Sequence, residues 1–185
     1  MLIDPVILRT GQAAAAILFG TAAVSKLLDM RRFGQAVASY GLLPTLLLTP
    51  AAWLLALAEA AVAMSLPFDA VRQPAALAGL GLLSLFFAAI AISLARGHRD
   101  IDCGCWAFGA SGRDADARTG LSGWHLGRVA LLGALLLPAL FDASARAVVW
   151  VDYFTVLGTL AIAAGAFFAI DALLANQAAA QKLRS

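Results

Sequence analysis

Two residues, Cys103 and Cys105, are the only cysteines of the chain, and the single residue Gly104 separates them. A disulfide between them would close a very small ring with strained geometry, and strained disulfides are easily reduced. Gly104 suits such a ring, because glycine lacks a Cβ and adopts unusual backbone dihedrals. The spacing favours thiol–disulfide exchange, in which one thiolate attacks a partner disulfide and the second thiol resolves the mixed intermediate.

Metal binding is the main chemical alternative for this cysteine pair. Two sulfur and two nitrogen ligands would complete a tetrahedral zinc or copper site. The C-x-C spacing departs from the C-x2-4-C that is usual in structural zinc sites. A third interpretation is a pair of inert or permanently bonded cysteines. The four candidate ligands for a metal are Cys103, Cys105, His98 and His125.

The composition indicates that lipid surrounds most of the chain. Of 185 residues, 62% are hydrophobic and 13% charged, and the mean hydropathy is +0.88, whereas soluble domains hold about 25% charged residues. The net charge is only +2 and no extended basic patch exists, so a nucleic-acid-binding role is not expected. We expect residues 1–185 to form a single transmembrane domain in a lipid bilayer.

Five apolar stretches are long enough to be considered as membrane spans, since a span needs roughly 20 apolar residues. Inside lipid, only a helix satisfies its backbone hydrogen bonds from one segment. We therefore predict an all-α fold, a polytopic transmembrane helical bundle with about five spans around a four-helix core. Gly127, Gly133 and Pro138 would suit a kinked or partly re-entrant fourth element. The predicted spans are residues 6–28, 49–66, 75–95, 123–141 and 149–174, with the polar cysteine loop at 96–123.

Glu59 is a carboxylate near the middle of the second predicted span. A charge in the hydrocarbon core costs several kcal/mol unless it is paired, protonated or hydrated, so a bundle-internal or functional role is expected. Lys26 and Arg9, on the first span, are its most available partners. The plainer alternative is a protonated Glu59 that is hydrogen-bonded inside the bundle.

The Lys and Arg counts predict an orientation for five spans. Cytoplasmic loops carry an excess of these residues. One face receives three, Arg9, Arg72 and Arg146, and taken alone the rule places the other face, with the cysteine loop, in the cytoplasm. That other face receives ten: Lys26, Arg31, Arg32, Arg96, Arg99, Arg113, Arg118, Arg128, Lys182 and Arg184.

Several of these features occur in an order that resembles the MauE family, which is related to DoxX-like redox-associated membrane proteins. The resemblance covers roughly residues 6–140. Trp106 stands where the family would be expected to have Phe, a change that should leave thiol chemistry undisturbed. The matching features are Phe19-Gly20, Ala23 with Ser25-Lys26-Leu27, Phe33, Tyr40-Gly41-Leu42-Leu43-Pro44, Glu59, and Asp102-Cys103-Gly104-Cys105 followed by an aromatic residue.

The resemblance implies a thiol-redox protein of the bacterial inner membrane that would act as a component of a thiol–disulfide oxidoreductase system. Its expected partners are a MauD-like thioredoxin-fold protein and the disulfide-rich small subunit of periplasmic methylamine dehydrogenase, whose maturation it would assist. Cys103 and Cys105 would exchange electrons with the thioredoxin-like partner. Lys26 and Glu59 would be supports within the bundle, and a quinone or proton site there is left open; no other cofactor is implied.

Disulfide chemistry is expected outside the reducing cytoplasm. The resemblance therefore favours a cysteine loop at the periplasmic face, against the Lys and Arg count. Two other functions remain as alternatives: a metal-handling membrane protein that uses the cysteine pair and a histidine, and a non-catalytic membrane scaffold.

Overall fold

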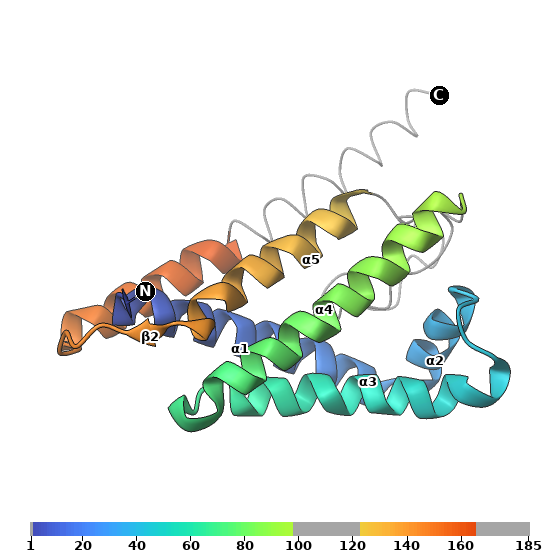
Figure 1. The fold of residues 1–185 in the computed structure, drawn as a ribbon, viewed down its shortest axis with the longest axis horizontal. Helices are drawn as coiled ribbons and strands as arrows, with labels where there is room; N and C mark the ends of the chain where they lie inside the picture. Colours follow the sequence, from blue (N-terminus) through green and yellow to red (C-terminus); the bar gives the residue numbers. More distant parts are fainter. Residues whose placement is uncertain (1, 98–122, 166–185) are drawn as a thin grey trace.

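The computed structural model describes residues 2–97 and 123–165, and these form a bundle of long helices (Figure 1). In chain order the elements are β1 (Leu2–Ile3), α1 (Pro5–Leu28), α2 (Met30–Ser39), α3 (Thr45–Ser65), the 3-10 helix η1 (Asp69–Val71), α4 (Arg72–Ala95), α5 (Gly123–Leu136), the 3-10 helix η2 (Leu137–Leu140) and β2 (Asp142–Ala143). A further apolar helix covers Trp150–Gly165.

Four of the helices, α1, α3, α4 and α5, form the core of the bundle. Each contacts the next in the ring α1–α3–α4–α5, and α5 returns to contact α1. Their shared core is made of small and branched side chains, together with Phe19. The core residues are Ala15, Phe19, Val62, Leu66, Ala75, Ala76, Leu83, Ile90, Val129, Leu136 and Ala139.

Close helix packing depends on glycine at two points. A Cβ on Gly11 of α1 would lie 2.8 Å from the backbone oxygen of Leu135. A Cβ on Gly79 of α4 would lie 3.0 Å from Leu136 Cδ1 and 3.2 Å from Val62 Cγ1. Small residues let membrane helices approach closely, so that van der Waals contact holds them together in lipid.

Local sequence signals explain where the helices begin and end. Asp4 begins α1, because its Oδ1 accepts a 2.8 Å hydrogen bond from the Val6 N–H, and Pro5 fits the first turn. Asp29 separates α1 from α2: its backbone N–H donates to Ser25 O, and its Oδ1 accepts from the Arg32 N–H at 2.9 Å. Gly41 has a φ of +60°, which favours glycine in the turn before α3.

The prediction of an all-α membrane helical protein is confirmed. Three helices of the described part are long and apolar enough to cross a membrane: Pro5–Leu28, Thr45–Ser65 and Asp69–Ala95. Two shorter apolar helices, Val129–Leu140 and Trp150–Gly165, lie within the fourth and fifth predicted spans. The five-span count and the single-domain organisation stay predictions.

Two features of the fold were not predicted. Helix α2 lies in a stretch expected to be a plain connection, and β1 pairs in parallel with β2, placing Leu2 beside Asp142 and Ile3 beside Ala143.

The fourth predicted span changes from α-helix to 3-10 helix at Leu137, next to Pro138. That change fits a helix interrupted by proline.

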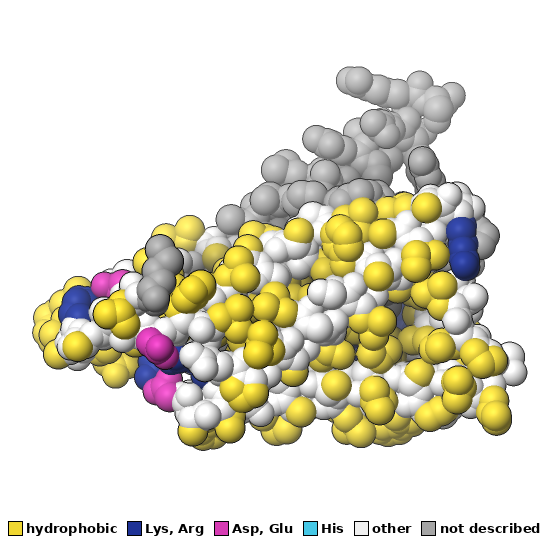
Figure 2. Space-filling model, viewed as in Figure 1, with side chains coloured by type: hydrophobic (Ala, Val, Ile, Leu, Met, Phe, Trp, Pro, Cys, Tyr) yellow, Lys and Arg dark blue, Asp and Glu magenta, His cyan; other side chains and the backbone are white. Residues whose placement is uncertain are grey.

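Figure 2 shows that hydrophobic side chains cover most of the visible face of the bundle. Acidic and basic side chains gather together at one end of this face, and a small group of basic side-chain atoms lies at the other. We call the first the N-terminal end; it holds the start of α1, the end of α3, the start of α4, and η2 with β2. The opposite end, the loop end, holds the end of α1, α2, the start of α3 and the end of α4.

Candidate functional site

Lys26 and Glu59 form a buried ion pair between α1 and α3. Lys26 Nζ donates a hydrogen bond to Glu59 Oε1, and the two side chains are only 2% and 4% exposed. Lys26 is two residues from the end of α1, so it lies near the loop end of the bundle. Of the two partners that the sequence offered for Glu59, the structure selects Lys26.

The Lys26 ammonium also contacts two aromatic rings. Its Nζ lies 5.0 Å from the ring centroid of Phe33 on α2 and 4.8 Å from that of Phe86 on α4. A cation within about 6 Å of an aromatic face is attracted by the ring quadrupole. One ammonium on α1 therefore links α2, α3 and α4, at the end of the bundle where α4 finishes.

The second oxygen of Glu59 is buried and, within the described part of the chain, has no hydrogen-bond partner. The same holds for Ser93 Oγ on α4 and for Gln12 Oε1 on α1. An unsatisfied polar atom in a low-dielectric interior is costly. Glu59 Oε2 can therefore accept a hydrogen bond from a water or another small polar group, or carry a proton.

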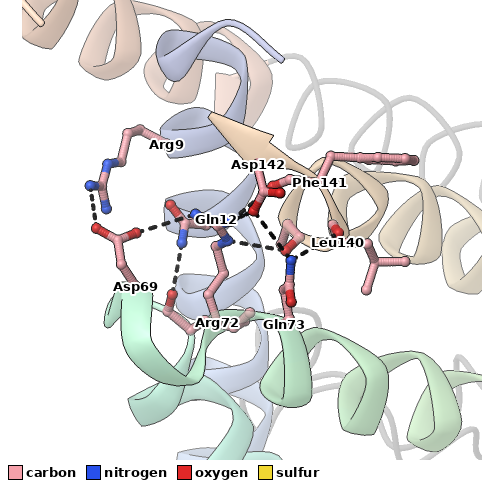
Figure 3. Close-up of polar contacts among 10 residues, drawn as sticks. Arg9, Gln12, Asp69, Arg72, Gln73, Leu140, Phe141 and Asp142 are labelled. Atoms are coloured by element: carbon pink, nitrogen blue, oxygen red, sulfur yellow. Dashed lines mark hydrogen bonds and ion pairs between the residues drawn. The ribbon is translucent and has the colours of Figure 1, made fainter. Parts of the chain in front are cut away.

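The N-terminal end holds a second polar cluster, drawn in Figure 3. Arg72 is its centre: its Nε donates to Ala139 O at 3.1 Å and its Nη2 to Phe141 O at 2.9 Å. The same guanidinium lies 3.4 Å from an Asp69 oxygen and 3.7 Å from an Asp142 oxygen. Arg72 therefore ties the start of α4 to the end of the fourth helical element.

Neighbouring side chains extend this cluster. Arg9, the other predicted partner for Glu59, instead forms a 2.7 Å ion pair with Asp69 (Figure 3). Gln12 Nε2 donates to Leu66 O at 3.0 Å, at the end of α3. Gln73 Nε2 donates to Leu140 O at 3.3 Å.

Arg146 forms a related arrangement in the connection after β2. It pairs with Asp4 at 3.3 Å and with Asp152 at 3.0 Å. The hydrogen bond to Asp152 raises the pKa of Arg146 above its usual value, so the guanidinium stays charged. The three arginines that the structure describes at the N-terminal end are thus paired with aspartates.

Sequence reasoning missed Arg72 as an organising residue. Its spacing of three from Asp69 was visible, but its main acceptors are backbone carbonyls almost 70 residues away. No side-chain pattern encodes such contacts. The Lys26–Glu59 pair was accessible to prediction because a carboxylate in an apolar helix requires a partner.

The cysteine pair and its predicted neighbours lie outside the described residues. This applies to Cys103, Gly104, Cys105 and His98, and to the side chain of His125, whose backbone belongs to α5. The structure does place the two ends of their segment: α4 finishes at Ala95 and α5 begins at Gly123. The proposed thiol and metal chemistry stays a prediction at these residues.

An apolar groove of about 610 Å³ lies between α3 and α4. Among the described residues, no charged side chain lines it. Its walls are mostly small residues: Ala58, Ala61, Val62, Ser65, Ala75, Ala78, Gly81, Leu82 and Leu85.

The fold and the buried pair define a class: a helical membrane protein whose bundle is tied by an intramembrane Lys–Glu pair. The sequence model of one family, described as "Methylamine utilisation protein MauE", matches residues 4–142. The chain belongs to the MauE family, and this confirms the resemblance found in the sequence.

Three relatives carry the same name, methylamine utilization protein MauE. The chain is 41% identical to the protein of Paracoccus denitrificans over 108 residues, 58% of each chain. It is 40% identical to that of Paracoccus versutus over 136 residues, 74% of this chain and 73% of the relative. The Methylophilus methylotrophus protein is 37% identical over 105 residues, 57% of this chain and 55% of the relative. No solved structure matches.

Proposed function

We propose that the chain is an inner-membrane component of methylamine utilisation that performs thiol–disulfide exchange through Cys103 and Cys105. The observation that carries the proposal is the C-G-C pair itself, which contains both cysteines of the chain and lies in its longest polar segment. Membership of the MauE family supplies the pathway. By the resemblance, the exchange assists disulfide formation in the small subunit of methylamine dehydrogenase.

The exchange needs only the two sulfur atoms and a partner with a cysteine pair. A thiolate of a reduced thioredoxin-like partner attacks the Cys103–Cys105 disulfide, and that S–S bond breaks as a mixed disulfide forms. The second thiolate of the partner then breaks the mixed disulfide. The partner leaves with a disulfide, and Cys103 and Cys105 leave as two thiols that hold the two transferred electrons. Relative reduction potentials set the direction, and the same steps run in reverse.

In this proposal, Lys26 and Glu59 are positioning residues. They link α1 to α3 and, through the two phenylalanine rings, to α2 and α4. The loop end therefore keeps a fixed arrangement from which the cysteine segment extends. A rigid supporting element holds a reactive group in place more accurately than a loose one.

We place the cysteine segment at the periplasmic face, because stable protein disulfides form in oxidising compartments. The Lys and Arg count favours the opposite orientation, but loop charges bias topology without fixing it. The thioredoxin-like partner and the exported dehydrogenase subunit would both meet the segment on the periplasmic side.

Single cysteine variants test the exchange. In cells growing on methylamine, C103S or C105S should accumulate a mixed disulfide with a thioredoxin-fold protein, visible as a reducible adduct by gel and identified by mass spectrometry. The double variant is the matched control and should form none. If neither single variant forms an adduct while the purified wild type holds stoichiometric zinc or copper, the protein handles metal and the redox proposal is wrong.

A further inference from the structure

Helix α2 is too short to cross a bilayer. Ten residues make a helix about 15 Å long, too short for a hydrocarbon core about 30 Å thick. Only Asp29 separates α2 from α1, so α2 begins where α1 ends. One face is buried, where Phe33 packs with Ala52 and Ala56 of α3. An amphipathic helix in this position has its other face turned toward the headgroups.

The outward face of α2 is polar and basic. Arg31, Gln35 and Ser39 are exposed on the side opposite Phe33, as the helical period of 3.6 residues requires. Arg96, just past the end of α4, is exposed at the same end of the bundle.

Few acidic residues lie at this end within the described ranges. Its acidic residues within the described ranges are Asp29, whose Oδ1 caps α2, and Glu59, which is buried with Lys26. At the N-terminal end, in contrast, each arginine in the described part of the chain is paired with an aspartate. Among the described residues, Arg31 and Arg96 therefore offer positive charge to an external anion.

Exposed leucines lie at the same end of the bundle as these arginines. Leu42 and Leu43 follow α2, and Leu46 and Leu47 lie in the first turn of α3; Leu46 is 86% exposed. An end that carries both exposed arginines and exposed leucines fits the boundary between headgroups and acyl chains, where both kinds of side chain find a partner. A water-soluble acidic protein would leave those leucines uncovered.

We propose that the loop end binds anionic phospholipids, with Arg31 and Arg96 holding the phosphate groups and the leucines of residues 42–47 contacting the acyl chains. Guanidinium groups form short, charge-assisted and often bidentate hydrogen bonds to phosphate. The proposal depends on α2 and the end of α4, and it holds whether or not Cys103 and Cys105 exchange electrons.

Lipid binding to the purified full-length protein tests this proposal. Native mass spectrometry in a mild detergent gives the apparent dissociation constant for the first phosphatidylglycerol and the first phosphatidylcholine. The wild type should prefer phosphatidylglycerol. R31Q/R96Q should weaken phosphatidylglycerol binding by roughly fivefold for each arginine removed, with phosphatidylcholine binding unchanged. R31K/R96K, which keeps the charge, should retain most of the preference.

The matched control is R9Q/R146Q, which removes two arginines from the N-terminal end. Because both of these are already paired with aspartates, the preference for phosphatidylglycerol should stay within about twofold of the wild type. An equal loss in this control, or no loss in R31Q/R96Q, would overturn the proposal. Binding of free sn-glycerol 3-phosphate as tight as that of the lipid would show a phosphate site and not a lipid surface.

Discussion

The N-terminal end and the loop end of the bundle manage their charges in different ways. At the N-terminal end, Arg9, Arg72 and Arg146 are matched by aspartates, and Arg72 also satisfies two backbone carbonyls. Among the described residues of the loop end, the buried pair leaves Glu59 Oε2 without a described partner, and the exposed charged side chains are three arginines and Asp29. In the first arrangement, the charged groups satisfy one another and hold neighbouring elements together. The second leaves a buried carboxylate oxygen and exposed arginines available for interaction.

The largest expected effect is on function at the loop end. Changing both Cys103 and Cys105 to serine should abolish the formation of active methylamine dehydrogenase, because no thiol remains to exchange electrons. Dehydrogenase activity and disulfide content of the small subunit, in cells that depend on this chain, give the measurement. Full activity with normal levels of the variant in the membrane would leave only the scaffold function.

Breaking the buried pair should be the most damaging change to stability. Lys26→Met or Glu59→Leu alone leaves one uncompensated charge inside the bundle and should cost about 3–5 kcal/mol in the free energy of unfolding. The double variant removes both charges and should regain most of that loss. Unfolding by denaturant in detergent measures all three. If the double variant were as unstable as the sum of the single variants, the pair would not act as a unit.

Arg72 should matter more than its neighbour Arg9, although both contact Asp69. Arg72→Met removes two hydrogen bonds to backbone carbonyls from a side chain that is only 9% exposed, which should cost about 2–3 kcal/mol of unfolding free energy. Arg9→Gln, in a half-exposed pair, should cost less than about 1 kcal/mol. Equal losses in the two variants would contradict the central place given to Arg72.

Helix packing between the two ends gives the smallest expected effect. Gly79→Ala would place a methyl group 3.0 Å from Leu136 Cδ1 and 3.2 Å from Val62 Cγ1, and should lower stability by about 1–2 kcal/mol. Gly81→Ala is the control on the same helix, since nothing lies within 4 Å of its Cβ position. It should be neutral or slightly stabilising. A larger loss for Gly81→Ala would mean that the helices contact each other elsewhere.

The comparison of the two ends also shows what sequence reasoning can reach. Apolar runs located the long helices, because a span must be apolar along its whole length. Glu59 and Lys26 were found because a charge inside lipid requires a partner. Helix α2 was missed because its ten residues mix arginines with alanines and its buried face contains little more than Phe33 and Ala36. The contacts of Arg72 were missed because backbone carbonyls are present at every residue and leave no mark in the sequence.

Labelling of Cys103 and Cys105 in intact cells tests the central claim most directly. A membrane-impermeant thiol reagent is applied before and after mild reduction, and again after the cells are permeabilised. We expect both cysteines to react in intact cells only after reduction, as an accessible, easily reduced disulfide at the periplasmic face. Labelling that appears only in permeabilised cells, or that needs no reduction, would contradict a periplasmic redox pair.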